Sequence, residues 1–196
     1  MTPLLVTRPA DEAAAAAARI GPHAIVAPCL AFEALAPARP ALPGADLLVA
    51  SPRSVPGLLA VGVDPTWRVL ALAPATAAAL VEAGLRVDVV VPGGGAALAA
   101  AARRDASVIA ATSDLGGAEV LRVRPDAHVW VLYRTVCPAS LPPPARAALD
   151  GPFDVWFTSP SAVRNFDRLA PGALGRARRV LWFGATTGAE IERYGR

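Results

Sequence analysis

The chain has 196 residues, of which 54% are hydrophobic and 18% charged, and its formal net charge is +3. That composition excludes a disordered chain, the lack of a basic run argues against nucleic-acid binding, and the lack of lysine excludes Schiff-base catalysis. Because Pro, Gly or Asp breaks its apolar stretches well short of a membrane span, we expect a soluble cytoplasmic protein with no membrane partner.

In the first half of the chain, short apolar runs alternate with helical stretches. Asp11 is expected to cap the first helix and Gly21-Pro22 to end it. In order, the pattern predicts a strand within 4–9, a helix over 12–20, a strand over 23–28, an extended segment over 29–35, a Pro-rich connector over 37–44, a strand over 46–50, a helix opened by Ser51-Pro52, a strand over 67–71, a helix over 73–83, a strand over 87–91 and a helix over 96–104.

The second half repeats the same alternation. Ser159 is a good N-cap, and Pro160 suits the first position of the helix that follows it. In order, we expect a strand from 107, a polar turn at 112–114, a helix, an extended segment over 128–134, a short helix over 145–149, a strand over 153–157, a helix from 160, a strand over 180–183 and a last helix that ends near 194–195.

Two stretches recur, which indicates an internal duplication. The strand-turn-helix stretch 45–55 returns as 153–163, and the threonine turn 73–78 returns as 184–189. The first copy then continues with another strand and helix, 87–104, for which the second copy has no counterpart. Alternating strands and helices predict parallel sheets covered on both faces. The expected fold class is therefore α/β, with two doubly wound parallel-sheet domains.

Hydroxyl and arginine side chains follow several predicted strands. Ligands of doubly wound sheets bind beyond the carboxyl ends of the strands, and first-turn helix amides there attract anions. For the hydroxyls, helix capping is an equally good explanation and can coexist with binding. The cleft between the two domains is the expected site, and its candidate residues are Arg8, Ser51, Thr76, Ser113, Ser159 and Thr187.

Cysteine and histidine are too few and too scattered for a metal site. Cys29, Cys137, His23 and His128 form none of the short spacings that metal ligands use. We expect no metal, and we expect these four residues to be buried or half-buried in strands.

Two other features have simple structural interpretations. The loop 92–95 resembles a phosphate loop, but no Lys-Ser/Thr pair follows it. A flexible loop is the favoured interpretation, and a nucleotide-binding regulator is a weaker alternative. The arginine clusters 103–104 and 176–179 are expected to be solvated helix ends.

An ordered set of short motifs resembles those of the uroporphyrinogen-III synthases. The set covers nearly the whole chain, and no single motif carries the resemblance. Ala73 and Ala185 depart from it, because they replace a glycine and a proline of the family's paired turns. The matching stretches are Val6-Thr7-Arg8-Pro9, 157–163, Leu132-Tyr133-Arg134-Thr135 and the two threonine turns.

The resemblance implies two flavodoxin-like domains joined by a two-strand linker. It assigns residues 1–34 and 137–196 to domain 1, which would lack its last strand and helix, and residues 37–132 to domain 2. The linker strands would lie at about 29–36 and 129–136.

The resemblance also implies a reaction. A monomeric hydro-lyase of haem biosynthesis would remove water from hydroxymethylbilane and close it to uroporphyrinogen III, inverting the last pyrrole ring, without a cofactor. Tyr133 would assist departure of the hydroxyl as a weak general acid, although it could equally be a linker tyrosine that packs at the hinge. Thr7 and Ser161 join the candidate substrate-binding residues. A non-catalytic binding module for an acidic tetrapyrrole or another polyanion stays open as the alternative.

Overall fold

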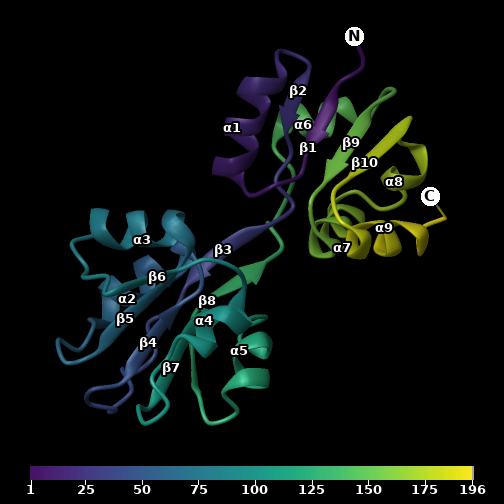
Figure 1. Ribbon diagram of the computed structural model, residues 1–196. Coiled ribbons are helices and arrows are strands. Elements are labelled where there is room, and N and C mark those ends of the chain that lie inside the picture. Colours follow the sequence, from purple (N-terminus) through teal and green to yellow (C-terminus); the bar gives the residue numbers. More distant parts are fainter. Residues whose placement is uncertain (196) are drawn as a thin grey trace. The chain divides into compact units, whose positions relative to one another are not determined.

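The structure is a computed structural model that describes residues 1–195. The chain divides into two compact units: unit 1 contains residues 1–31 and those from 136 onward, and unit 2 contains residues 32–135. Figure 1 shows that the N-terminal segment, in purple, and the C-terminal segment, in yellow, both belong to unit 1. Each unit has a sheet of its own.

Unit 1 is built on a four-stranded parallel sheet in the order β10-β9-β1-β2. Its elements are β1 (Leu4–Val6), α1 (Ala10–Ile20), β2 (Ala24–Val26), α6 (Pro143–Ala148), β9 (Asp154–Phe157), α7 (Pro160–Leu169), α8 (Ala173–Arg176), β10 (Arg179–Trp182) and α9 (Ala185–Glu192). One face of the sheet packs against α6, α7, α8 and α9 around Phe153, Phe157 and Phe166. On the other face, α1 lies against β1 and β2.

Unit 2 is built on a six-stranded sheet in the order β3-β8-β7-β4-β5-β6. Its elements are β3 (Ala31–Ala34), β4 (Asp46–Val49), the 3-10 turn η1 (Pro52–Ser54), α2 (Val55–Val61), β5 (Arg68–Leu72), α3 (Ala73–Glu82), β6 (Val89–Val91), α4 (Gly95–Ala100), β7 (Val108–Ser113), α5 (Ala118–Val123) and β8 (His128–Val136). The five strands from β8 to β6 are parallel.

Both faces of the unit 2 sheet are covered. Leu58 of α2 and Leu80 of α3 belong to the core on one face, and Leu98 of α4 and Val120 of α5 belong to the core on the other. In unit 1, helices likewise lie on both faces of a parallel sheet. The predicted class, α/β with two doubly wound parallel-sheet units, is confirmed.

The duplication is visible in the strand register. Asp46 pairs in register with Arg68 at the start of β4 and β5, and Asp154 pairs with Arg179 at the start of β9 and β10. Both carboxylates are buried and bind arginine: Asp46 binds Arg68 and Arg103, and Asp154 binds Arg178 and Arg179. These hydrogen bonds hold the pKa of Asp154 well below its usual value.

Several local expectations need correction. Helix α1 begins at Ala10 after Pro9, with no side-chain capping bond, so Asp11 lies inside the helix and does not cap it. His128 is exposed, because it lies at the very start of its strand. The arginine clusters are not simply solvated helix ends, because Arg103, Arg178 and Arg179 bind buried carboxylates.

One helix start and one helix end also differ from expectation. Pro52 opens a short 3-10 turn before α2. Helix α4 ends at Ala100, and the Arg103 amide beyond it donates to the Asp46 carboxylate. Among the described residues, no helix is both long enough and apolar enough to cross a membrane.

Candidate active site

Tyr133 lies on β8 near the carboxyl end of the unit 2 sheet, half-buried against an aromatic neighbour. Its ring meets the ring of Phe32, on β3, edge to face at 5.8 Å between centroids. The guanidinium of Arg53 lies 4.2 Å from the centre of the Phe32 ring, a cation–π distance. The three side chains come from segments far apart in the sequence and form one cluster.

Asp114 holds the backbone of β8 from Tyr133 to Thr135. The Asp114 amide donates to the Tyr133 carbonyl at 3.1 Å, and the Asp114 carboxylate accepts from the Thr135 amide at 3.1 Å. Asp114 comes directly after β7, whose pairing with β8 shifts in register between Thr112 and Ser113. Because both bonds link the residue that follows β7 to β8, they hold the Tyr133 backbone in place beside the end of β7.

Three predicted hydroxyls of unit 2 follow the strands β4, β5 and β7. Ser51 is half-buried, and its oxygen accepts the amide of Arg53 at 3.2 Å, which makes it a cap of η1. Ser113 is buried at the end of β7, and Thr76 is buried in the first turns of α3. Burial of Thr76 favours a role through packing and helix geometry over an open hydroxyl.

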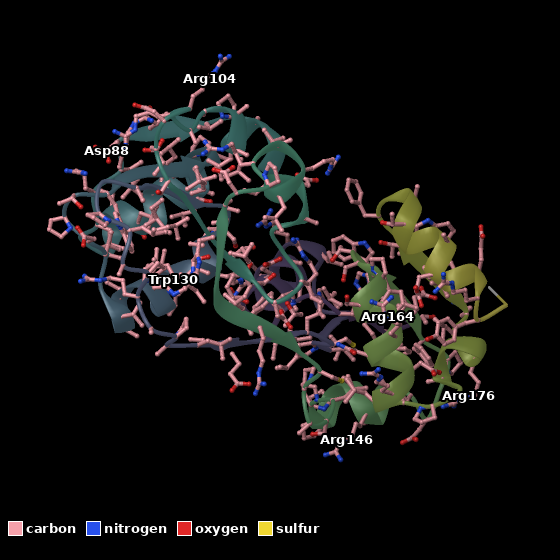
Figure 2. All side chains as sticks on the ribbon, turned by 90° about the horizontal axis from the view of Figure 1, so that it is seen from below. Asp88, Arg104, Trp130, Arg146, Arg164 and Arg176 are labelled. Carbon is pink, nitrogen blue, oxygen red and sulfur yellow. The ribbon has the colours of Figure 1, made fainter. Side chains whose placement is uncertain are left out.

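In unit 1, the serine turn after β9 forms as predicted. Ser159 accepts the amide of Ala162 at 3.2 Å and caps α7, and Pro160 takes the first helical position. Ser161 accepts a hydrogen bond from Arg164 at 3.2 Å, and Arg164 also pairs with Glu190 of α9 at 2.9 Å. Figure 2 labels Arg164, whose side chain leaves α7.

The remaining candidates of unit 1 differ in exposure. Thr7 is fully buried and donates to the Trp156 carbonyl at 2.7 Å, which ties β1 to β9. Thr187 is buried in the first turn of α9, as Thr76 is in α3. Arg8 pairs with Glu12 at 2.6 Å beside a pocket, and its buried Nε has no hydrogen-bond partner among the described residues.

The glycine loop of unit 2 is already occupied by a carboxylate of the chain itself. The Gly95 amide, at the start of α4, donates to the Glu119 carboxylate at 2.9 Å. A Cβ atom at Gly95 would lie 3.0 Å from the same oxygen, so the contact is close. A nucleotide phosphate would have to displace an anion from this position, which disfavours the nucleotide-binding alternative.

Cys29 does not supply an alternative nucleophile. Cys29 is fully buried and hydrogen-bonded to the Ala27 carbonyl, and burial raises the pKa of its thiol far above the usual value. Within residues 1–195, no three His, Cys, Asp or Glu side chains converge as metal ligands would.

Sequence reasoning missed Phe32, Arg53, Asp114 and Arg164. A weak signal existed for two of them. Arg53 follows the predicted turn at Ser51-Pro52, and Phe32 lies in the segment predicted to run extended beside the strand of Tyr133. Asp114 and Arg164 are recognised only from their contacts across the fold.

Two doubly wound units, each with hydroxyl-bearing turns at the carboxyl end of its sheet, define a duplicated α/β protein. The family model described as Uroporphyrinogen-III synthase HemD matches residues 11–196. The chain therefore belongs to the uroporphyrinogen-III synthase family, whose members are hydro-lyases of tetrapyrrole biosynthesis. No curated protein matches the chain significantly.

Two solved structures share the fold. The uroporphyrinogen-III synthetase of Helicobacter pylori 26695 is 16% identical, with a TM-score of 0.68 over 100% of this chain and 90% of that one. A mutant uroporphyrinogen III synthase of Thermus thermophilus is 18% identical, with a TM-score of 0.53 over 98% of this chain and 89% of that one. The predicted family, fold and enzyme class are thus confirmed.

Proposed function

We propose that this chain converts hydroxymethylbilane to uroporphyrinogen III and that Tyr133 is its general acid. The observation that carries the proposal is the fixed Tyr133 position, with Asp114 bonded to the Tyr133 carbonyl and to the Thr135 amide that follows, and with Phe32 against the Tyr133 ring. A group held in this way needs little reordering before it donates a proton.

In this reaction Tyr133 donates one proton to the substrate and regains one proton from it. The carbon–oxygen bond of the substrate's hydroxymethyl group breaks while the Tyr133 hydroxyl protonates the departing oxygen. Water departs, and a delocalised cation stays on the substrate. The substituted α-carbon of the last pyrrole ring attacks that cation, and its bond to the original methylene bridge then breaks to give a second delocalised cation. The free α-carbon of the same ring attacks this second cation, and the proton that this carbon loses on rearomatisation restores the tyrosine. The inverted last ring distinguishes this product from the isomer that forms without an enzyme.

The turns at the carboxyl ends of the strands in each sheet bind the carboxylates of the substrate. The substrate is a polycarboxylate, and helices α3, α7 and α9 each begin after a parallel strand, with a hydroxyl residue in the first turns or at the cap. Helix N-termini in this position favour anions. We assign Ser51, Ser113, Ser159 and Ser161 to this role, with Thr76 and Thr187 shaping the helix starts. Thr7 positions the strand that precedes Arg8. One chain carries all of these residues, so we propose a monomer as the active species.

The test replaces each tyrosine in turn, since the chain has only two, Tyr133 and Tyr194. Tyr133→Phe removes the acidic hydroxyl and keeps the ring, and we expect kcat to fall about 100-fold, the lower end for a lost general acid. Product affinity, measured by titration, should stay nearly unchanged. Tyr194→Phe, the control, should keep full turnover.

The two variants also separate catalysis from packing. A Tyr133→Phe enzyme with the wild-type kcat would remove the hydroxyl from the mechanism and leave Tyr133 as a packing residue. An equal loss in both variants would point to a general effect on folding, which the unfolding midpoint of each variant would register.

A further inference from the structure

Unit 2 contains a pocket between α4 and α5 that is lined by none of the residues assigned above to the substrate. The two helices lie side by side on one face of the sheet (Figure 1). The pocket has a volume of about 340 Å³, at the small end of ligand pockets, so it suits one ring system rather than a whole tetrapyrrole. Its floor and walls, the α4–α5 pocket, are apolar and include Leu48, Ala50, Leu72, Leu98, Ala110 and Val120.

One buried hydroxyl lines this pocket without a partner of its own. Thr112, next to last in β7, is 6% exposed, and among the described residues its hydroxyl makes no hydrogen bond. Gly116 leaves room for that hydroxyl, because a Cβ atom at Gly116 would collide with Thr112 Oγ1. A buried polar group that the protein leaves unpaired is available to a ligand that fills the pocket.

The charge of the pocket is negative. Of the described lining residues, Glu119 of α5 alone is charged. The Gly95 amide donates to its carboxylate at 2.9 Å, and in the part of the chain that the structure describes no arginine pairs with it. A carboxylate repels other carboxylates and attracts an N–H donor or a positive charge. The α4–α5 pocket therefore fits the body of a pyrrole ring and not the acidic side chains of the substrate.

The pocket and the Tyr133 side chain belong to the same face of the sheet. Ala110 lies in the core beneath α4 and α5, whereas Leu132 lies in the core on the opposite face. Because side chains alternate along a strand, Tyr133 points to the face that Leu132 avoids. Thr112 pairs in register with Val131, two residues before Tyr133. A ring beside Thr112 thus has Tyr133 as a neighbour along β8.

We propose that the α4–α5 pocket binds the pyrrole ring that carries the hydroxymethyl group of the substrate. The Thr112 hydroxyl accepts the ring N–H, and the Glu119 carboxylate faces the positive charge that develops on that ring. Leu115, which lines the pocket and is 70% exposed, covers the bound ring from the mouth. The assignment of this ring to the pocket rests on the proposed function.

The chemistry of the first step gives the pocket a role in turnover. When the hydroxymethyl carbon–oxygen bond breaks, positive charge spreads from the exocyclic carbon to the ring nitrogen, and the N–H becomes a stronger donor. Thr112 and Glu119 then interact more strongly with the cation than with the neutral ring, which lowers the barrier. Neither residue transfers a proton, because Tyr133 protonates the departing oxygen.

Two small rings of the same shape test the binding step without the substrate. α,α′-Dimethylpyrrole has a ring N–H, and α,α′-dimethylfuran has an oxygen in its place. In ligand-observed NMR titrations of the intact chain, we expect the pyrrole to bind about fivefold more tightly than the furan, the effect of one neutral hydrogen bond. Thr112→Val should bind the two rings equally.

A second pair of variants locates the bound ring. Ala118 lines the pocket at the start of α5 and is exposed, so Ala118→Phe fills the pocket from its mouth without disturbing the core. We expect it to weaken binding of both rings about tenfold or more, since it removes the apolar contact surface. Ala78→Phe, at an exposed position of α3, should bind as the wild type does. The unfolding midpoint of each variant registers any loss of folding.

Turnover tests the carboxylate. Glu119→Gln should lower kcat about fivefold, the effect of one charge at close range in water, and leave KM nearly unchanged, because the positive charge exists only after the bond begins to break. Glu82→Gln, which changes an exposed carboxylate of α3, should turn over as the wild type does.

Different results would overturn the pocket assignment and the proposed function. Equal affinity of the wild type for pyrrole and furan, or undiminished binding by Ala118→Phe, would overturn the pocket assignment even in a chain that forms isomer III. A wild-type kcat in Glu119→Gln would remove the carboxylate from it. Isomer I alone, from a chain that prefers the pyrrole through Thr112, would contradict the proposed function and support the ligand class of the pocket.

Discussion

At the scale of single residues, the best-defined electrostatic feature is the buried carboxylate that starts a central strand in each unit. Asp154 accepts hydrogen bonds from Arg178 at 2.9 Å and from Arg179 at 2.6 Å, and Asp46 occupies the equivalent position. Both lie at the amino ends of their strands, away from the turns proposed to bind substrate. Their role is therefore in stability.

Asp154→Asn should lower the free energy of unfolding by about 2 kcal/mol at neutral pH, because charge-assisted hydrogen bonds from two arginines are lost. The pKa of Asp154 is lowered in the folded protein, so its stabilisation is full above the unfolded pKa of about 3.9. It is lost as pH falls from there through the folded pKa.

Urea unfolding at several pH values measures both effects. The difference between wild type and Asp154→Asn should shrink below about pH 4. Asp150→Asn, which changes an exposed carboxylate of the same unit, is the control and should have little effect. A difference that stays constant down to low pH would contradict the assigned pKa shift.

At the scale of elements, the two threonine turns show how one helix start tolerates different residues. Ala73 begins α3 with φ of +62°, and Gly184 precedes α9 with φ of +85° at the equivalent position. Glycine adopts this left-handed region freely, whereas alanine is strained by about 1–2 kcal/mol. The departure of Ala73 from the family's glycine thus has a physical cost.

Ala73→Gly should raise the free energy of unfolding by about 0.5–1 kcal/mol, since the relief of strain exceeds the added entropy of the unfolded chain. The same change at the exposed mid-helix position Ala78 should lower it by about 1 kcal/mol. Thermal unfolding of both variants tests the pair. A loss of stability from Ala73→Gly would show that the left-handed turn is not strained.

At the scale of the whole molecule, the duplication was the most predictable feature. Strands and helices alternate with clear turn signals, and Ser159-Pro160 opened its helix as expected. Contacts between distant segments were not predictable in the same way. Phe32, Arg53 and Tyr133 are well separated along the chain, and only the sheet order brings them together.

The same reason explains the misassigned arginines. Arg103 and Arg178 occur in basic clusters, which are typical of solvent-exposed helix ends. Their partners, Asp46 and Asp154, are buried at the starts of strands that lie far from them in the sequence. A buried carboxylate at the start of an apolar strand was a usable signal, because such a group needs a cation. The two serine turns were easier to find, since Ser51 and Ser159 follow directly from local helix capping.

The identity of the product tests the central claim most directly. Freshly made hydroxymethylbilane is incubated with the purified chain and without it, and the uroporphyrinogen isomers are separated and measured over time. The account predicts that the chain yields isomer III at a rate well above the spontaneous closure. Isomer I alone, formed at the rate of the enzyme-free control, would contradict it.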